Sequence, residues 1–141
     1  MIPPNILCPG RVLCPLIKQE RFCGICSTKS PWLYNTKVGE VYNVPVSHGE
    51  GRFICSAHLF EQLKANGQIA TQYVDLAGQP TYDVAYNPNE SYMAIEGITS
   101  PDGRVFGKMA HSERVGKNIC KNVYGEKDQK IFLSGVEYFT K

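Results

Sequence analysis

The pattern of apolar and polar residues changes near residue 29 of this 141-residue chain. The first 28 residues hold four of the nine prolines and show no sustained helical or strand period, so we expect irregular structure there. From Ser30 onward, short β-rich runs alternate with turns and helical periods. We therefore predict an atypical Cys/Pro-rich segment over residues 1–29 and an ordered unit over residues 30–141.

The ordered part predicts several strands and two helices. Ser56 is a suitable N-cap for a helix over residues 57–65, which Asn66 and Gly67 would end. Apolar residues recur at helical spacing over residues 127–138, which predicts a second helix. Together these elements indicate a mixed α/β sheet domain. The predicted strands cover residues 40–46, 52–55, 69–75, 92–95 and 103–109.

Composition and charge exclude several classes of function. The formal net charge of +2 gives no reason to expect binding to nucleic acid or to an anionic membrane surface. No apolar run approaches the ~20 residues of a membrane span, and the N-terminus lacks the basic region of a signal peptide. We therefore expect a cytoplasmic protein with reduced thiols. The six cysteines are Cys8, Cys14, Cys23, Cys26, Cys55 and Cys120.

Four of these cysteines leave two chemical alternatives open. Cys8, Cys14, Cys23 and Cys26 lie within nineteen residues and could form a small zinc module. Their C-x5-C-x8-C-x2-C spacing matches no established zinc motif, so we expect no metal. Gly24-Ile25-Cys26 looks superficially like a nucleophile elbow, but no helix is signalled after Cys26 to lower its thiol pKa. We therefore do not expect Cys26 to be a nucleophile.

His111 and Glu113 are the candidate base and its orienting acid. On an extended strand, side chains two positions apart face the same way, so Glu113 can reach the His111 ring. Such a contact fixes the imidazole tautomer and stabilises its positive charge, as in the base-and-orienter half of a nucleophilic triad. The alternative is a surface strand end that carries a His and a Glu by chance.

The run His48-Gly49-Glu50-Gly51-Arg52 is a second candidate site. Its glycines would allow a tight turn close to a ligand. Its charged side chains could bind the amino and carboxylate groups of an amino acid. The alternative is a polar hairpin loop without a ligand.

Several segments, taken in order from about Ser30 to the C-terminus, resemble one enzyme family. The series is similar to the C-terminal part of the class I glutamine amidotransferase domain of phosphoribosylformylglycinamidine synthase. The segments are Ser30-Pro-Trp-Leu33, His48-Gly-Glu-Gly-Arg-Phe53, residues 66–75, residues 86–89, residues 93–104, Gly107-Lys-Met-Ala-His-Ser-Glu-Arg114 and residues 121–129.

This resemblance implies a fold and a set of site residues. The fold would be the C-terminal half of a mixed, mostly parallel sheet with flanking helices. His111 would deprotonate a cysteine that attacks the side-chain amide of glutamine, and Glu113 would orient His111. The implied glutamine-binding residues come from a loop beside the pocket and from a neighbouring strand: His48, Glu50, Gln72 and Tyr73.

The resemblance also implies what would have to come from elsewhere. The family's nucleophilic cysteine lies in a Gly-x-Cys-x-Gly elbow upstream of the Ser-Pro-Trp segment, and residues 1–29 hold no convincing elbow. We therefore expect a glutaminase portion that is inactive alone, with the synthetase domain or the missing N-terminal half of the glutaminase domain as its partner. It would supply ammonia for ATP-dependent amidine formation in purine biosynthesis. ATP and Mg would act in the synthetase domain, and no cofactor is expected in this chain. The alternative is a non-catalytic interaction fragment that docks on a synthetase or complementary subunit.

Overall fold

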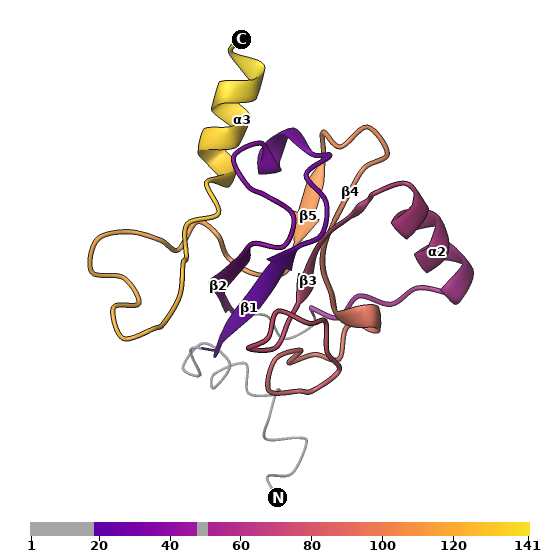
Figure 1. Cartoon of the computed structure of the whole chain (residues 1–141), viewed down its shortest axis with the longest axis horizontal. Coiled ribbons are helices and arrows are strands. Elements are labelled where there is room, and N and C mark those ends of the chain that lie inside the picture. Colours follow the sequence, from indigo (N-terminus) through magenta and orange to yellow (C-terminus); the bar gives the residue numbers. More distant parts are fainter. Residues whose placement is uncertain (1–18, 48–50) are drawn as a thin grey trace, which may run out of the picture.

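A five-stranded sheet forms the centre of the protein (Figure 1). The computed structural model describes residues 19–47 and 51–141. The sheet has the strand order β2-β1-β3-β4-β5. The elements, in chain order, are β1 (Gln19–Ile25), η1 (Pro31–Leu33), β2 (Val41–Val46), α2 (Ala57–Ala65), β3 (Ile69–Tyr73), η2 (Tyr92–Ala94), β4 (Ile95–Thr99), β5 (Phe106–Lys108) and α3 (Ile131–Phe139).

All four strand pairings in this sheet are antiparallel. The expected mostly parallel sheet is therefore wrong for the described residues, although the α/β class is confirmed. Parallel neighbours need a long crossover connection, whereas antiparallel neighbours can be joined by a tight turn. A tight turn joins β4 and β5, in which Gly103 N donates to Ser100 O and Ser100 N donates to Val105 O.

β1 is an inner strand, second in the order of the sheet, although its sequence lies in a segment without a sustained period. It pairs with β2 on one side and with β3 on the other. Cys23 and Ile25 are buried, and a Cβ on Gly24 would lie 3.0 Å from Cγ1 of Val74. The expected irregular structure is therefore wrong for Gln19–Ile25. The rest of the Cys/Pro-rich segment, residues 1–18, lies outside the described residues.

The helix predicted over residues 57–65 is confirmed as α2. The Ser56 hydroxyl accepts a hydrogen bond from Leu59 N at 3.2 Å, which satisfies one of the free N–H groups of the first turn. The helix buries Phe60 and Leu63 in an apolar cluster that also holds Ile69 and Ile95. This contact attaches α2 to β3 and β4.

The C-terminal helix α3 begins later than its sequence predicts. Oε1 of Glu126 accepts hydrogen bonds from the N–H groups of Lys127 and Asp128, and Oδ1 of Asp128 accepts from Lys130 N. Such local side-chain bonds compete with the helical ladder, so the helix starts at Ile131. In Figure 1, α3 lies beside η1 and well away from α2.

Two of the predicted strands take other forms. Residues 52–55 form no strand, because Phe53 N donates to the Ser91 hydroxyl and Phe53 O accepts from Tyr92 N. Residues 92–94 form the 3-10 helix η2, in which Met93 has a positive φ of 49°, and β4 begins only at Ile95. Within the described ranges, no helix is long and apolar enough to cross a membrane.

Candidate active site

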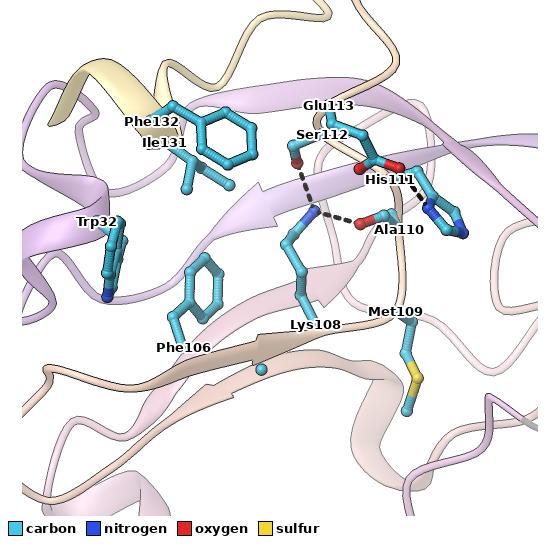
Figure 2. Close-up of a pocket in the computed structure, with 11 residues that line it drawn as sticks. Trp32, Phe106, Lys108, Met109, Ala110, His111, Ser112, Glu113, Ile131 and Phe132 are labelled. Atoms are coloured by element: carbon cyan, nitrogen blue, oxygen red, sulfur yellow. Dashed lines mark hydrogen bonds and ion pairs between the residues drawn. The ribbon is translucent and has the colours of Figure 1, made fainter. Parts of the chain in front are cut away.

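His111 and Glu113 form a hydrogen-bonded pair just beyond the end of β5. Nδ1 of His111 lies 2.7 Å from Oε1 of Glu113 (Figure 2). The pair does not lie on an extended strand, as the sequence suggested: β5 ends at Lys108, and Arg114 N donates back to His111 O across a turn. An Nδ1–H that donates to the carboxylate leaves Nε2 of the neutral ring unprotonated, and this nitrogen can act as a base.

The electrostatics of Glu113 fit an orienting role. Partial burial alone would raise the pKa of its carboxyl, but hydrogen bonds from its own backbone N–H and from His111 hold this pKa below its usual value. Glu113 is therefore ionised at neutral pH. Its side chain is 53% exposed and that of His111 is 31% exposed, so a ligand can reach the pair.

The pair borders a cavity of about 480 Å³ that lies between β5, η1 and α3. One part of its wall is apolar and the other carries the polar groups (Figure 2). Pockets of this size with an apolar wall and a few convergent polar groups are typical of small-molecule sites. The apolar part consists of Trp32, Phe106, Ile131 and Phe132, and the polar part of Lys108, His111, Ser112 and Glu113.

The structure adds two residues that the sequence did not single out. Glu96 of β4 and Lys108 of β5 form a buried ion pair, with Nζ of Lys108 3.4 Å from Oε1 of Glu96. In the sequence, each is a single charged residue within a β-rich run, and this pattern is the signal by which the two residues could have been found. They lie beside each other because Gly97 pairs with Lys108 in the register of β4 and β5.

Gln72 and Tyr73 lie on β3 and are not among the residues that line the cavity beside His111. Tyr73 is fully buried in the core of the sheet. The Gln72 amide is engaged within the protein, because its Oε1 accepts from Cys26 Sγ at 3.1 Å and its Nε2 donates to Met93 O at 2.7 Å. The proposed contact of these two residues with glutamine stays a prediction. His48 and Glu50 lie outside the described residues.

The described cysteines are free thiols, and the two near the end of β1 are held in the protonated form. Burial raises the pKa of Cys23 well above its usual range, and burial together with the charge of Glu96 raises the pKa of Cys26 to about 11. No helix follows Cys26 directly. A nucleophilic thiol needs the opposite environment. Cys8 and Cys14, the other cysteines of the suggested zinc module, lie outside the described residues.

Residues 19–139 match the family described as a CobB/CobQ-like glutamine amidotransferase domain. The chain belongs to this family. The resemblance that the sequence alone indicated is thereby confirmed, and the match also includes β1, upstream of Ser30.

Relatives of known name support the same assignment. The chain is 38% identical over 124 residues to the phosphoribosylformylglycinamidine synthase subunit PurQ of Methanococcus maripaludis, covering 75% of this chain and 46% of that protein. It is 37% identical over 108 residues to the same subunit of Prochlorococcus marinus, covering 77% and 43%. The chain therefore spans less than half the length of these relatives.

A solved structure shows that the fold is shared as well. The structure of PurLQS from Thermotoga maritima contains a chain that aligns with a TM-score of 0.62 and 24% sequence identity, over 87% of this chain and 48% of that chain. Together with the family match, this alignment shows the fold of part of a glutamine amidotransferase domain.

Proposed function

We propose that this chain carries the base and the orienting acid of a glutaminase and works as part of a larger glutamine amidotransferase. The observation that carries the proposal is the 2.7 Å approach of His111 Nδ1 to Glu113 Oε1 at the edge of a cavity. Membership of the glutamine amidotransferase family supports glutamine as the substrate.

The chemistry assigned to the pair has two proton transfers. Nε2 of His111 takes the proton of a cysteine thiol, and the thiolate attacks the side-chain amide carbon of glutamine. The imidazolium then gives this proton to the nitrogen that leaves as ammonia. Water hydrolyses the resulting thioester and releases glutamate. Throughout, the Glu113 carboxylate orients the ring and stabilises its positive charge.

The thiol itself would come from polypeptide beyond the described residues. Cys23 and Cys26 are poor candidates because burial keeps both thiols protonated at neutral pH. The relatives are more than twice as long as the region they share with this chain. We infer that the part of the domain found in those relatives and unmatched here supplies the nucleophile.

The names of the relatives support a more specific proposal, a role in purine biosynthesis. As a counterpart of subunit PurQ, the chain would supply ammonia for ATP-dependent amidine formation in purine biosynthesis. ATP and Mg would act in a partner synthetase, and His48 and Glu50 stay candidate glutamine contacts. A cytoplasmic location belongs to this proposal, supported by the free thiols of the described cysteines.

The proposal is tested by complementation. The full chain is mixed with the N-terminal half of the Methanococcus maripaludis relative, and ammonia release from glutamine is measured. We expect activity from the mixture and none from either part alone. His111→Ala should lower this activity by on the order of 10²–10⁴-fold, the usual contribution of a general base.

His58→Ala is the matched control because His58 is an exposed histidine on α2, away from the cavity. It should leave ammonia release unchanged. A mixture that remains inactive, or one that His111→Ala does not affect, would contradict the proposal. Glutamine hydrolysis by the chain alone that Cys26→Ala abolishes would show that the nucleophile lies in this chain.

A second candidate function, a non-catalytic interaction fragment, is favoured by the exposed apolar side chains of α3. Phe132 and Val136 are 63% and 61% exposed, and Phe139, which packs on Trp32, is 51% exposed. We infer that the complementary part of the amidotransferase domain packs on these side chains, because the relatives contain it. Native mass spectrometry of the same mixture separates the two functions: a stable complex without ammonia release supports docking alone.

A further inference from the structure

Glu96 and Lys108 are buried charges that the proposed chemistry does not use. Their side chains are 0% and 12% exposed. A buried ion pair is costly to desolvate and is retained only where good geometry and further hydrogen bonds satisfy both groups. Apart from Thr71 of β3, the partners of this pair lie on the loop that carries His111.

The Glu96 carboxylate binds the start of this loop. Its Oε1 accepts hydrogen bonds from Met109 N at 3.1 Å and from Ala110 N at 2.7 Å. Its Oε2 accepts from the Thr71 hydroxyl of β3 at 2.5 Å, which fixes the carboxylate to the sheet.

The Lys108 ammonium binds the same loop from the other side. Nζ donates to Ala110 O at 3.1 Å and to the Ser112 hydroxyl at 2.8 Å (Figure 2). Ser112 in turn donates to Oε1 of Gln129, a residue with no exposed surface. The two charges together therefore hold both backbone groups of Ala110, and Lys108 also holds Ser112, on the two sides of His111.

Two further hydrogen bonds hold the loop to β2 and to the residue that follows it. His111 N donates to Pro45 O of β2 at 2.8 Å, and Arg114 donates to the Ser47 hydroxyl at 2.9 Å. The only charge-assisted hydrogen bonds among these anchors at positions 109 to 112 come from Glu96 and Lys108. Charge-assisted bonds are roughly twice as strong as neutral ones.

We propose that the Glu96–Lys108 pair is a positioning device that sets the orientation and tautomer of the His111 ring relative to Glu113. This inference rests on the proposed glutaminase function for its purpose. The buried ion pair would fix the His111 imidazole through the backbone on either side of it. This effect on the ring can be measured in the chain alone, without any catalysis.

The position of the His111 ring depends on these anchors of the loop. When the pair is removed, Ala110 and Ser112 lose their charged partners, and the loop can rotate the His111 ring away from Glu113. The neutral ring then loses the carboxylate that selects the Nδ1–H form, and the Nε2–H form gains population.

The test uses the full chain labelled with ¹⁵N at its histidines, in which NMR reads the ring nitrogens at a pH where the ring is neutral. The wild-type His111 should show the Nδ1–H form. Lys108→Met leaves the Glu96 charge buried alone and can prevent folding. The double variant Glu96→Gln with Lys108→Met leaves no charge unpaired, and the new side-chain amide oxygen at position 96 can still accept from the loop.

In the double variant we expect a tautomer mixture with the Nε2–H form above one half, while the backbone spectrum of β1 to β4 is retained. Lys117→Met is the matched control, because Lys117 is an exposed lysine in the following loop, and it should keep the wild-type tautomer. A folded double variant with the wild-type tautomer would overturn the inference. So would loss of the sheet in this variant, because the pair would then serve the fold and not His111.

The two proposals fail in different ways. A wild-type His111 in the Nε2–H form would contradict the proposed glutaminase geometry itself. In the complementation mixture, the double variant should lower kcat with little change in KM. Lys108 lines the cavity, but its ammonium is already bonded to Ala110 O and to the Ser112 hydroxyl, so we expect the pair to act through the base. Equal kcat values for wild type and double variant would speak against the positioning role alone.

Discussion

Gly135 of α3 lies directly against the indole ring of Trp32 in η1. A Cβ at position 135 would overlap Cζ3 and Cε3 of this ring, so only glycine allows the helix to approach so closely. The contact joins residues about a hundred positions apart and closes one side of the cavity beside His111, since Trp32 and two residues of α3 line it. The position of the C-terminal helix and the shape of the candidate site therefore depend on the same contact.

Gly135→Ala is expected to destabilise this region even though alanine favours helices. The added methyl group must displace the Trp32 ring, and such overpacking costs about 1–3 kcal/mol. Trp32 is the only tryptophan in the chain, so its fluorescence should shift to longer wavelength as the ring becomes more exposed. Val136→Ala, at a largely exposed position of the same helix, is the control. An unshifted spectrum together with higher stability would contradict the packing described.

We expect the thiol of Cys26 to react slowly with alkylating reagents. Because burial and the nearby Glu96 raise its pKa to about 11, its thiolate is roughly 100-fold scarcer at neutral pH than that of an unperturbed cysteine. Peptide mass spectrometry of iodoacetamide labelling at pH 7.5 should therefore show much slower modification of Cys26 in the native chain than in urea. Equally fast labelling in both, with protection by glutamine, would instead support Cys26 as a nucleophile.

Glu113→Gln should weaken ammonia release in the complementation mixture but affect it less than His111→Ala does. A neutral amide can still contact the ring, but it cannot stabilise the imidazolium that forms when the thiol is deprotonated. We expect a loss of on the order of 10²-fold, within the range of acid–base contributions. Glu61→Gln on the exposed face of α2 is the control for loss of charge. Activity equal to wild type would remove Glu113 from the mechanism.

Acid should destabilise the chain through carboxyls that the fold keeps ionised. The hydroxyl of Ser100 lowers the pKa of Asp102, and the N–H of Asp128 lowers that of Glu126. Because the folded-state pKa lies below the unfolded one, each contribution is present near neutral pH and is lost as pH falls below about 4. Urea midpoints of wild type and Asp102→Asn should therefore differ at pH 7 and converge toward pH 3. A difference that does not change with pH would contradict this.

Local sequence patterns predict some elements of this fold and fail to predict others. The Ser56 cap and the stop at Asn66 and Gly67 determine α2, which the structure confirms. β1 was missed because a short run around Gly24, with cysteines in place of β-branched residues, carries little strand signal. Its strand form is imposed by pairing with β2 and β3 on both sides. The later start of α3 has a local cause, but only the structure shows which hydrogen bonds Glu126 makes.

The sequence by itself determined the family and the pair His111 and Glu113, because a two-residue spacing brings these side chains within reach over a short stretch of backbone. Only the tertiary structure decided the antiparallel pairing, the closing of the cavity by Trp32 and α3, and the burial of Glu96 beside Lys108. Each of these depends on contacts between residues distant along the chain, and the free energy of such contacts comes from packing and desolvation that local patterns do not encode.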